Sequence, residues 1–279
     1  MSYELDFDLN ALVEQVEKEG PDQSQAKKGP EKLPEGTPFL RMFGYIELGQ
    51  QKRMVKGVEK IQNRGRIGFE LSGPKYPPVQ TDNGPKPRII WTQEITLSQD
   101  DRSAGFKLFT AMNKGLKLKH FVQMIGDRAQ FMGEIKHSED GKYANLLLDS
   151  IKPAYKEDID ENTGDKILTP YKVAPMVTKP VVFVRAFATP AMWDELFIPG
   201  EYEAKVDAEG NITKPAQSKN RWQEQILAAE DAHTLPIYDY AVGKLSRKSQ
   251  EAVDEAVGGT DTPPAAPPMD DFADDDIPF

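Results

Sequence analysis

The chain has 279 residues but no cysteine, only three histidines and no long apolar run. Without cysteine it can form neither disulfides nor thiolate zinc sites. His120, His137 and His233 are too far apart in the sequence to indicate a histidine metal site. No stretch of about 18 apolar residues is present that could span a membrane, and the acidic N-terminus lacks the basic and apolar regions of a signal peptide. We therefore expect a soluble, cytoplasmic protein with no metal, no cofactor and no membrane contact.

The signatures of common enzymes are missing as well. Gly243-Lys244 is followed by Leu245 and lacks the upstream glycine, so it does not begin a phosphate-binding loop. There is no His-Glu-x-x-His and no Gly-x-Ser-x-Gly sequence. The adjacent carboxylates Asp100 and Asp101 are typical of a solvated loop rather than of a nuclease metal site. The sequence therefore predicts a binding protein and not an enzyme.

Acidic and basic residues are unevenly distributed along the chain, whose net charge is −10. Residues 1–26 hold seven acidic residues and one basic residue, and residues 251–279 hold nine acidic residues and no basic one. The part between them has 34 basic residues against 29 acidic ones, and residues 41–136 alone have 17 against nine. A basic body between acidic ends is typical of a nucleic-acid-binding protein with an interaction tail.

The sequence pattern divides the chain into three parts. Residues 1–36 predict an acidic amphipathic helix at 5–19 and a polar linker, because leucine and valine recur at helical spacing before a Gly-Pro pair. This helix either packs on the main domain or contacts a neighbouring subunit. Residues 37–250 form the main domain. Residues 251–279 predict a disordered tail, a flexible Pro-rich linker that ends in an acidic tip.

The main domain is expected to be mainly β. Strands are predicted at residues 39–48, 66–71 and 88–97, a helix at 106–113, and the strands of a hairpin at 129–136 and 143–151. Three strands, a helix and a hairpin follow one another in an OB-fold, a partly open, five-stranded Greek-key barrel. Residues 154–250 are expected to add strands and short helices to this barrel, including a strand at 181–188 and helices at 191–197 and 221–229.

Cations and aromatic rings recur along the first half of the domain, as single-strand binding requires. Arg41, Phe43 and Tyr45 alternate along the first predicted strand, and we expect them to face solvent while the residues between them face the core. Any one of these aromatic residues can instead belong to the core, and the arginines can be solvated loop charges. The candidate DNA-binding residues are Arg41, Phe43, Tyr45, Lys52, Arg53, Lys56, Arg64, Arg66, Tyr76, Lys86, Arg88 and Trp91.

The last six residues combine three carboxylates with two apolar side chains and the terminal carboxylate. Such a tip has too little apolar surface to fold alone, but it suits docking, because Phe279 can fill a pocket and its carboxylate can meet a cation. The candidate partner-binding residues are Asp274, Asp275, Asp276, Ile277, Pro278 and Phe279.

This tip resembles the C-terminal peptide of bacterial and bacteriophage single-stranded DNA-binding proteins, which recruit replication and repair enzymes through it. The body resembles them only in type, and its length is more similar to the proteins of tailed bacteriophages. The resemblance implies a protein that coats single strands in DNA replication, recombination and repair, in the bacterial host cytoplasm if the protein is phage-encoded. Its partners would be single-stranded DNA and a polymerase, primase, helicase or nuclease, and a homo-oligomer is left open.

The sequence leaves two other classes of protein open. One is a metal-dependent nuclease or a strand-annealing factor with the same tail. The other is an acidic DNA-mimic inhibitor, against which the basic stretch of residues 41–136 argues.

Overall fold

The computed structural model describes residues 32–55, 57–81, 84–159, 164, 166–202, 204–206 and 212–245. The helix predicted at residues 5–19 and the whole predicted tail, residues 251–279, lie outside the described residues.

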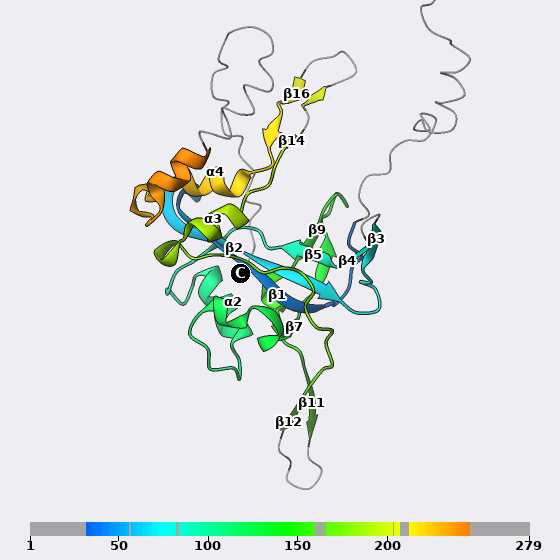
Figure 1. Ribbon diagram of the computed structural model, residues 1–279. Helices are drawn as coiled ribbons and strands as arrows, with labels where there is room; N and C mark the ends of the chain where they lie inside the picture. The colour runs from blue at the N-terminus through cyan, green and yellow to red at the C-terminus, as the bar shows by residue number, and fades with distance from the viewer. Residues whose placement is uncertain are drawn as a thin grey trace, which may run out of the picture.

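A long antiparallel hairpin is the centre of the fold (Figure 1). Its two strands pair from Phe39 opposite Ser72 to Val55 opposite Val58. Away from β1, the strand β2 pairs with two short strands, β5 and β6. Away from β2, the strand β1 pairs antiparallel with β7 and parallel with β13. The strands of this sheet are β1 (Phe39–Val55), β2 (Val58–Ser72), β5 (Arg88–Trp91), β6 (Ile95–Thr96), β7 (Phe131–Met132), β10 (Lys152–Pro153) and β13 (Val181–Phe183).

The sheet order β10-β7-β1-β2-β5 makes the chain a mainly β protein with a large, chiefly antiparallel sheet. A closed barrel would require the two ends of this order to pair. Among the described residues β5 and β10 do not pair. The mainly β class is therefore confirmed, whereas the OB-fold stays a prediction.

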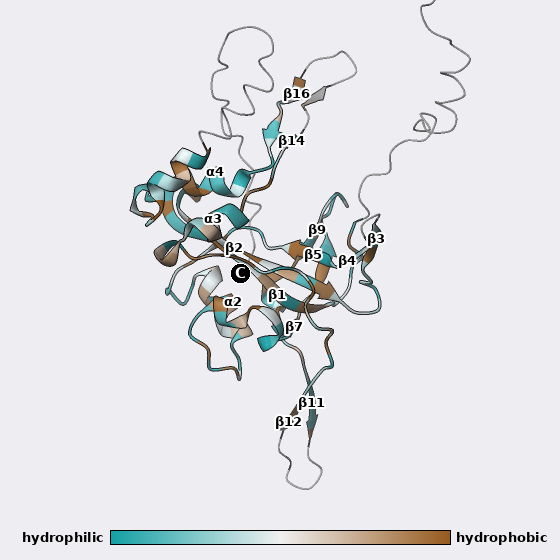
Figure 2. Ribbon diagram, in the orientation of Figure 1, coloured by the Kyte–Doolittle hydropathy of each residue, from teal (hydrophilic) through white to brown (hydrophobic). Residues whose placement is uncertain are grey.

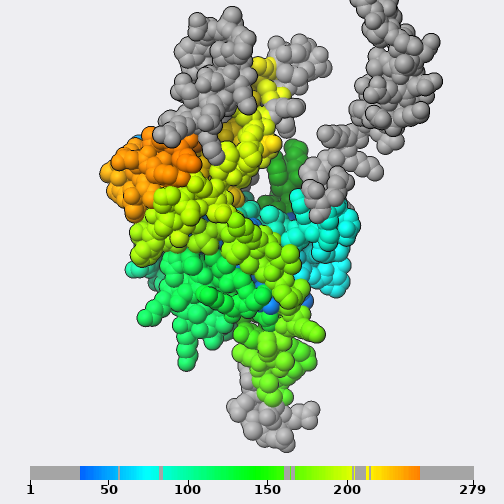
Figure 3. Space-filling view, viewed as in Figure 1, coloured from blue at the N-terminus to red at the C-terminus, as the bar shows by residue number. Residues whose placement is uncertain are grey.

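Five two-stranded antiparallel sheets accompany the central sheet in the described part of the chain. They are β3 (Val79–Thr81) with β4 (Gly84–Lys86), β8 (Ile135–His137) with β9 (Ala144–Leu146), β11 (Tyr155–Ile159) with β12 (Lys166–Pro170), β14 (Glu201–Tyr202) with β17 (Gln217–Ser218), and β15 (Lys205–Val206) with β16 (Ile212–Lys214). Figure 3 shows the β11–β12 hairpin protruding from the body at the lower end of the view.

The helices are short and begin at residues suited to cap them. Ser103 accepts a hydrogen bond from the Phe106 N–H at the start of α2 (Ala104–Met112), and Thr189 does the same for Met192 in α3 (Pro190–Glu195). The third α-helix is α4 (Arg221–Leu227), residues 238–245 are also helical, and the 3-10 helices are η1 (Phe121–Met124), η2 (Gly126–Arg128), η3 (Leu148–Ser150), η4 (Arg185–Phe187) and η5 (Ala232–Thr234). Within the described ranges no helix is long and apolar enough to cross a membrane.

Two hydrophobic cores lie on opposite faces of the central sheet. The first joins the sheet to α2 and includes Met42, Phe69 and Met112. The second joins it to α3 and α4 and includes Ile46 and Trp193. Figure 1 shows α2 on one side of the sheet and α3 and α4 on the other, and Figure 2 shows apolar residues along the central strands between them. Residues after 180 therefore share both a sheet and a core with β1.

A β-bulge in β1 decides which side chains face each core. The β1–β2 register shifts by one residue between Met42 and Gly44, and such a shift exchanges the two faces of a strand. Met42 before the bulge and Tyr45 after it consequently enter the same core. The predicted alternation, with Arg41, Phe43 and Tyr45 on one solvent-exposed face, is therefore wrong, and all three side chains are buried.

Candidate nucleic-acid interface

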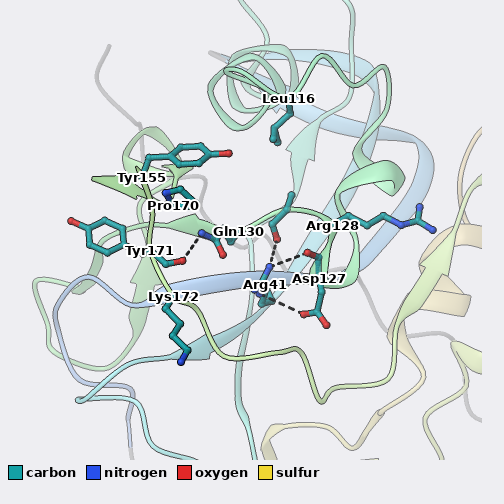
Figure 4. Close-up of a pocket in the computed structure, with 10 residues that line it drawn as sticks. Arg41, Leu116, Asp127, Arg128, Gln130, Tyr155, Pro170, Tyr171 and Lys172 are labelled. Atoms are coloured by element: carbon teal, nitrogen blue, oxygen red, sulfur yellow. Dashed lines mark hydrogen bonds and ion pairs between the residues drawn. The ribbon is translucent and has the colours of Figure 1, made fainter. Parts of the chain in front are cut away.

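An open pocket of about 440 Å³ lies where the segment after α2 faces the base of the β11–β12 hairpin (Figure 4). Its lining combines three cations, two tyrosines and one carboxylate. The lining residues are Arg41, Leu116, Asp127, Arg128, Ala129, Gln130, Tyr155, Pro170, Tyr171 and Lys172. Aromatic rings beside an excess of cations are the two components of a single-strand binding site.

Arg41 forms the floor of the pocket and ties its two walls together. The guanidinium donates to the carbonyl of Ala129 at 3.0 Å on one wall. On the other wall it donates to the carbonyls of Val173 at 3.3 Å and Ala174 at 3.2 Å. A further bond reaches the carbonyl of Asp127 at 3.3 Å. Four of its five N–H groups are therefore used within the fold, and Arg41 acts as a buried clamp rather than as the exposed contact that the sequence predicted.

Arg128 and Lys172 supply the accessible positive charge of the pocket. Both side chains are exposed, and neither has an ion pair or a side-chain hydrogen bond with a described residue. The single acid, Asp127, lies 3.7 Å from the Arg41 Nε and accepts a hydrogen bond from the Met176 N–H at 2.9 Å. Three cations against one carboxylate leave the pocket with an excess of two positive charges, which favours an anionic ligand.

Tyr155 and Tyr171 lie at the base of the hairpin, where Tyr155 begins β11 and Tyr171 directly follows β12. Gln130 fixes this base by donating to the Tyr171 carbonyl at 2.7 Å, and the Tyr171 N–H donates to the carbonyl of Ala154 at 2.9 Å. The Tyr171 ring packs on Phe39, with ring centroids 5.3 Å apart. In Figure 4 the Tyr155 ring points across the pocket instead. Tyr155 is therefore the ring best placed to stack on a base.

Lysines continue from the pocket along the segment after α2. The side chains of Lys114, Lys117 and Lys119 are exposed and form no ion pair with a described residue. Leu116, which lies among them, lines the pocket directly. The segment therefore provides a row of positive charge beside the pocket, which can attract phosphates in series.

Three of the predicted DNA-binding arginines converge on one buried carboxylate, Glu94, whose side chain is 8% exposed. Arg53 forms an ion pair with it, and the guanidinium nitrogens of Arg64 and Arg66 lie 3.8 and 3.4 Å from its oxygens. Gln225 donates a further hydrogen bond at 2.7 Å. Arg53 of β1 and Arg64 and Arg66 of β2 are therefore joined to the segment just before β6, and Gln225 joins α4 to the same carboxylate. Of the three arginine side chains, those of Arg53 and Arg66 are partly exposed.

This arrangement favours the ionised form of the Glu94 carboxyl group. Burial alone raises the pKa of a carboxyl group, but the hydrogen bond from Gln225 and the guanidinium groups of Arg53 and Arg66 lower the pKa of Glu94 below its usual value. Three guanidinium groups on one carboxylate still leave a local excess of positive charge.

Most of the predicted aromatic contacts belong to the interior. Phe43 meets Trp91 edge to face with ring centroids 5.0 Å apart, and Trp91 in turn meets Trp222 at 4.6 Å. Tyr45 is buried, and burial raises the pKa of its phenol, which donates to Glu47 at 3.1 Å. The predicted open aromatic face on β1 is wrong because α4 and η1 cover both of its sides.

The remaining predicted residues are spread over the surface and the core. Lys52 is exposed and pairs with Glu230 at 2.7 Å. Tyr76 is buried and donates to the carbonyl of Pro34 at 2.9 Å. Lys86 is exposed, Arg88 is partly buried and donates to the carbonyl of Pro77 at 3.1 Å, and Lys56 lies outside the described residues. The structure does not bring these side chains into one groove.

Sequence reasoning missed the residues that form the pocket, namely Arg128, Tyr155, Tyr171 and Lys172. A signal for three of them was present, because the dipeptides Tyr155-Lys156 and Tyr171-Lys172 repeat the same order of residues before and after residues 160–165. No comparable signal marked Arg128.

Comparison with known proteins gives no matching family model, no similar curated protein and no similar solved structure. Within the described ranges no three His, Asp or Glu side chains gather into a group that could hold a metal ion.

Proposed function

We propose that this protein binds single-stranded DNA with little sequence preference and coats single strands during replication, recombination and repair. The observation that carries the proposal is the pocket whose lining combines the ring of Tyr155 with two exposed cations, Arg128 and Lys172, that have no acidic partner among the described residues. Stacking on one aromatic ring contributes about 1–3 kcal/mol per base, whichever base it is. Phosphate contacts add affinity without reading sequence.

The fold supports the same function. Among the strands before α2 are β1, β2 and β5 of the central sheet, the β8–β9 hairpin follows α2, and β1 pairs with both β2 and β7. We interpret this arrangement as an OB-fold opened between β5 and β10 and enlarged by residues after 154. OB-folds are widely used to hold single strands with cations and rings.

The acidic tip supports a second activity, the recruitment of partners. Residues 274–279 resemble the recruiting peptide of single-stranded DNA-binding proteins, and they end in the aromatic residue Phe279. We propose that a polymerase, primase, helicase or nuclease in the bacterial cytoplasm binds this tip. The protein itself would then have no enzymatic activity.

A titration of the full chain with fluorescent oligonucleotides tests the proposal. The wild-type protein should prefer single strands to duplex by at least about tenfold, because only unpaired bases can stack on Tyr155. The double variant Arg128→Ala/Lys172→Ala should bind more weakly. The matched control is Arg102→Ala/Lys179→Ala, which also removes two exposed positive charges but takes them from pairs with Asp100 and Glu195.

Three outcomes would contradict the proposal. Equal affinity for duplex and single strand would indicate a general polyanion binder. Magnesium-dependent cleavage of the oligonucleotides would indicate the nuclease class. Absence of oligonucleotide binding would favour the inhibitor class.

A further inference from the structure

The β11–β12 hairpin exposes aliphatic side chains that its own packing does not use. Ile159 is 68% exposed, Ile167 is 45% exposed and Leu168 is 53% exposed. The two strands pair only with each other, and the hairpin protrudes from the body (Figure 3). A two-stranded hairpin gains little stability in isolation, so exposed apolar residues on it suggest contact with another molecule.

The strand register assigns these side chains to different faces. Tyr155 pairs with Pro170 and Asp158 pairs with Ile167, with no register shift between them. Because side chains alternate along a strand, Leu168 lies on the same face as Tyr155 and Pro170, and Ile167 lies on the opposite face. Ile159 shares the face of Tyr155 as well. The face that lines the pocket therefore continues outward as an apolar strip.

We infer that this strip, formed by Leu168 and Ile159, extends the pocket and packs against bases of the single strand that leave it. The inference rests on the proposed function and adds the direction in which the bound strand runs. Two residues along a strand advance about 7 Å. Stacked nucleotides advance about 3.4 Å each, so Leu168 adds space for about two bases beyond Tyr155.

The charges at the hairpin indicate that bases, rather than phosphates, meet the strip. The register places Glu157 opposite Leu168 and Lys166 opposite Ile159, so this face combines one acidic and one basic residue and has no net charge with which to hold phosphates. The exposed cations Arg128 and Lys172 are at the pocket itself, where they can hold the backbone of the strand. Apolar side chains pack well against the flat faces of bases.

The test compares two neighbouring residues on opposite faces of β12. Leu168→Ser removes an exposed side chain from the strip, and Ile167→Ser removes a similar one from the other face. Each full-length variant is titrated with a series of oligonucleotides of increasing length. For wild type the affinity should rise with length until the site is full. For Leu168→Ser the affinity should stop rising at a length about two nucleotides shorter and should reach a maximum about fivefold lower. For Ile167→Ser the affinity should depend on length as it does for wild type.

Short oligonucleotides separate this inference from the proposed function. Oligonucleotides that fill only the pocket should bind wild type and Leu168→Ser equally. If wild type binds no single strand of any length, the proposed function fails and the inference fails with it. If wild type binds but the two variants give the same length dependence, only the inference fails.

The strip could instead be covered by a second copy of the chain, and the oligomeric state of the protein distinguishes this occupant from single-stranded DNA. Sedimentation of the free proteins should give the same mass for wild type, Leu168→Ser and Ile167→Ser. A smaller mass for Leu168→Ser alone would make the strip an interface between copies and would overturn the inference.

Discussion

Gly44 lies directly opposite Gly68 in the central hairpin, and the ring of Trp91 covers the pair. A Cβ on Gly44 would overlap the six-membered ring of Trp91, and a Cβ on Gly68 would lie 2.8 Å from the Phe43 ring. Both glycines are therefore required by the close approach of aromatic rings to the β1–β2 backbone. This contact connects the sheet to α4 through Trp222.

Gly44→Ala should lower the free energy of unfolding by about 2–3 kcal/mol, because Trp91 must move and its packing must change. Chemical denaturation of the purified variant measures the change. The control is Gly243→Ala in helical residues 238–245, where a Cβ meets no atom and alanine favours the helix by up to about 1 kcal/mol. Equal stability of both variants would contradict the role of the ring.

Glu94→Gln should reduce the free energy of unfolding by about 1–3 kcal/mol at neutral pH, because three guanidinium groups lose their carboxylate. The pKa of Glu94 is lowered in the folded protein, so its stabilisation is present above the pKa of the unfolded chain and is lost as the pH falls through the folded pKa. The stability difference between wild type and Glu94→Gln should therefore shrink on acidification below about pH 4.5.

Thermal unfolding between pH 3 and 7 checks this prediction. Asp149→Asn is the matched control, because Asp149 is exposed and has no ion pair among the described residues. A difference between wild type and Glu94→Gln that does not change with pH would show that the carboxylate is not the source of the stability.

The salt dependence of DNA binding should change with the pocket cations. If Arg128 and Lys172 each neutralise one phosphate, replacing both by alanine should reduce the log–log slope of affinity against salt by about 1.4, since each contributes about 0.7. Titrations at several salt concentrations measure the slope. The variant Arg102→Ala/Lys179→Ala should keep the wild-type slope, and the same reduction there would show a general charge effect.

Deletion of Phe279 should abolish recruitment of replication enzymes, because a terminal aromatic residue concentrates apolar area and a carboxylate at one point of an interface. Addition of one glycine after Phe279 should also weaken recruitment by displacing the carboxylate. DNA binding should stay within a factor of a few in both variants. A pull-down from host lysate with wild type and both variants measures recruitment, and equal recovery of partners would leave the tip as a solubilising tail.

The sequence predicted the strands and helices better than the faces they present. The predictions at residues 39–48, 106–113 and 221–229 agree with β1, α2 and α4. The extension of the β1–β2 hairpin through residues 49–65 was missed, because the many charged residues there suggested a loop. Residues 50–55 and 58–63 include no buried residue, so no apolar alternation marks them.

The site was harder to predict than the fold because its parts are distant in the sequence. The bulge near Met42 is a backbone feature that reverses alternation without a clear sequence mark, so Phe43 and Tyr45 were assigned to the wrong environment. The pocket joins residues from β1, η2 and the β11–β12 base, and only tertiary packing brings them together. The charge distribution located the basic stretch of residues 41–136 but not the exposed cations that lack an acidic partner among the described residues.

The bonds of Arg41 have a consequence for the thermodynamics of binding. They hold residues 127–129 and 173–174 together before any ligand arrives, so the pocket is preorganised. Binding of a ligand then orders few protein groups, so the ligand rather than the protein loses most of the conformational entropy on association. Calorimetry of oligonucleotide binding should accordingly give a heat-capacity change that reflects only the apolar surface buried by the oligonucleotide, without a contribution from protein folding.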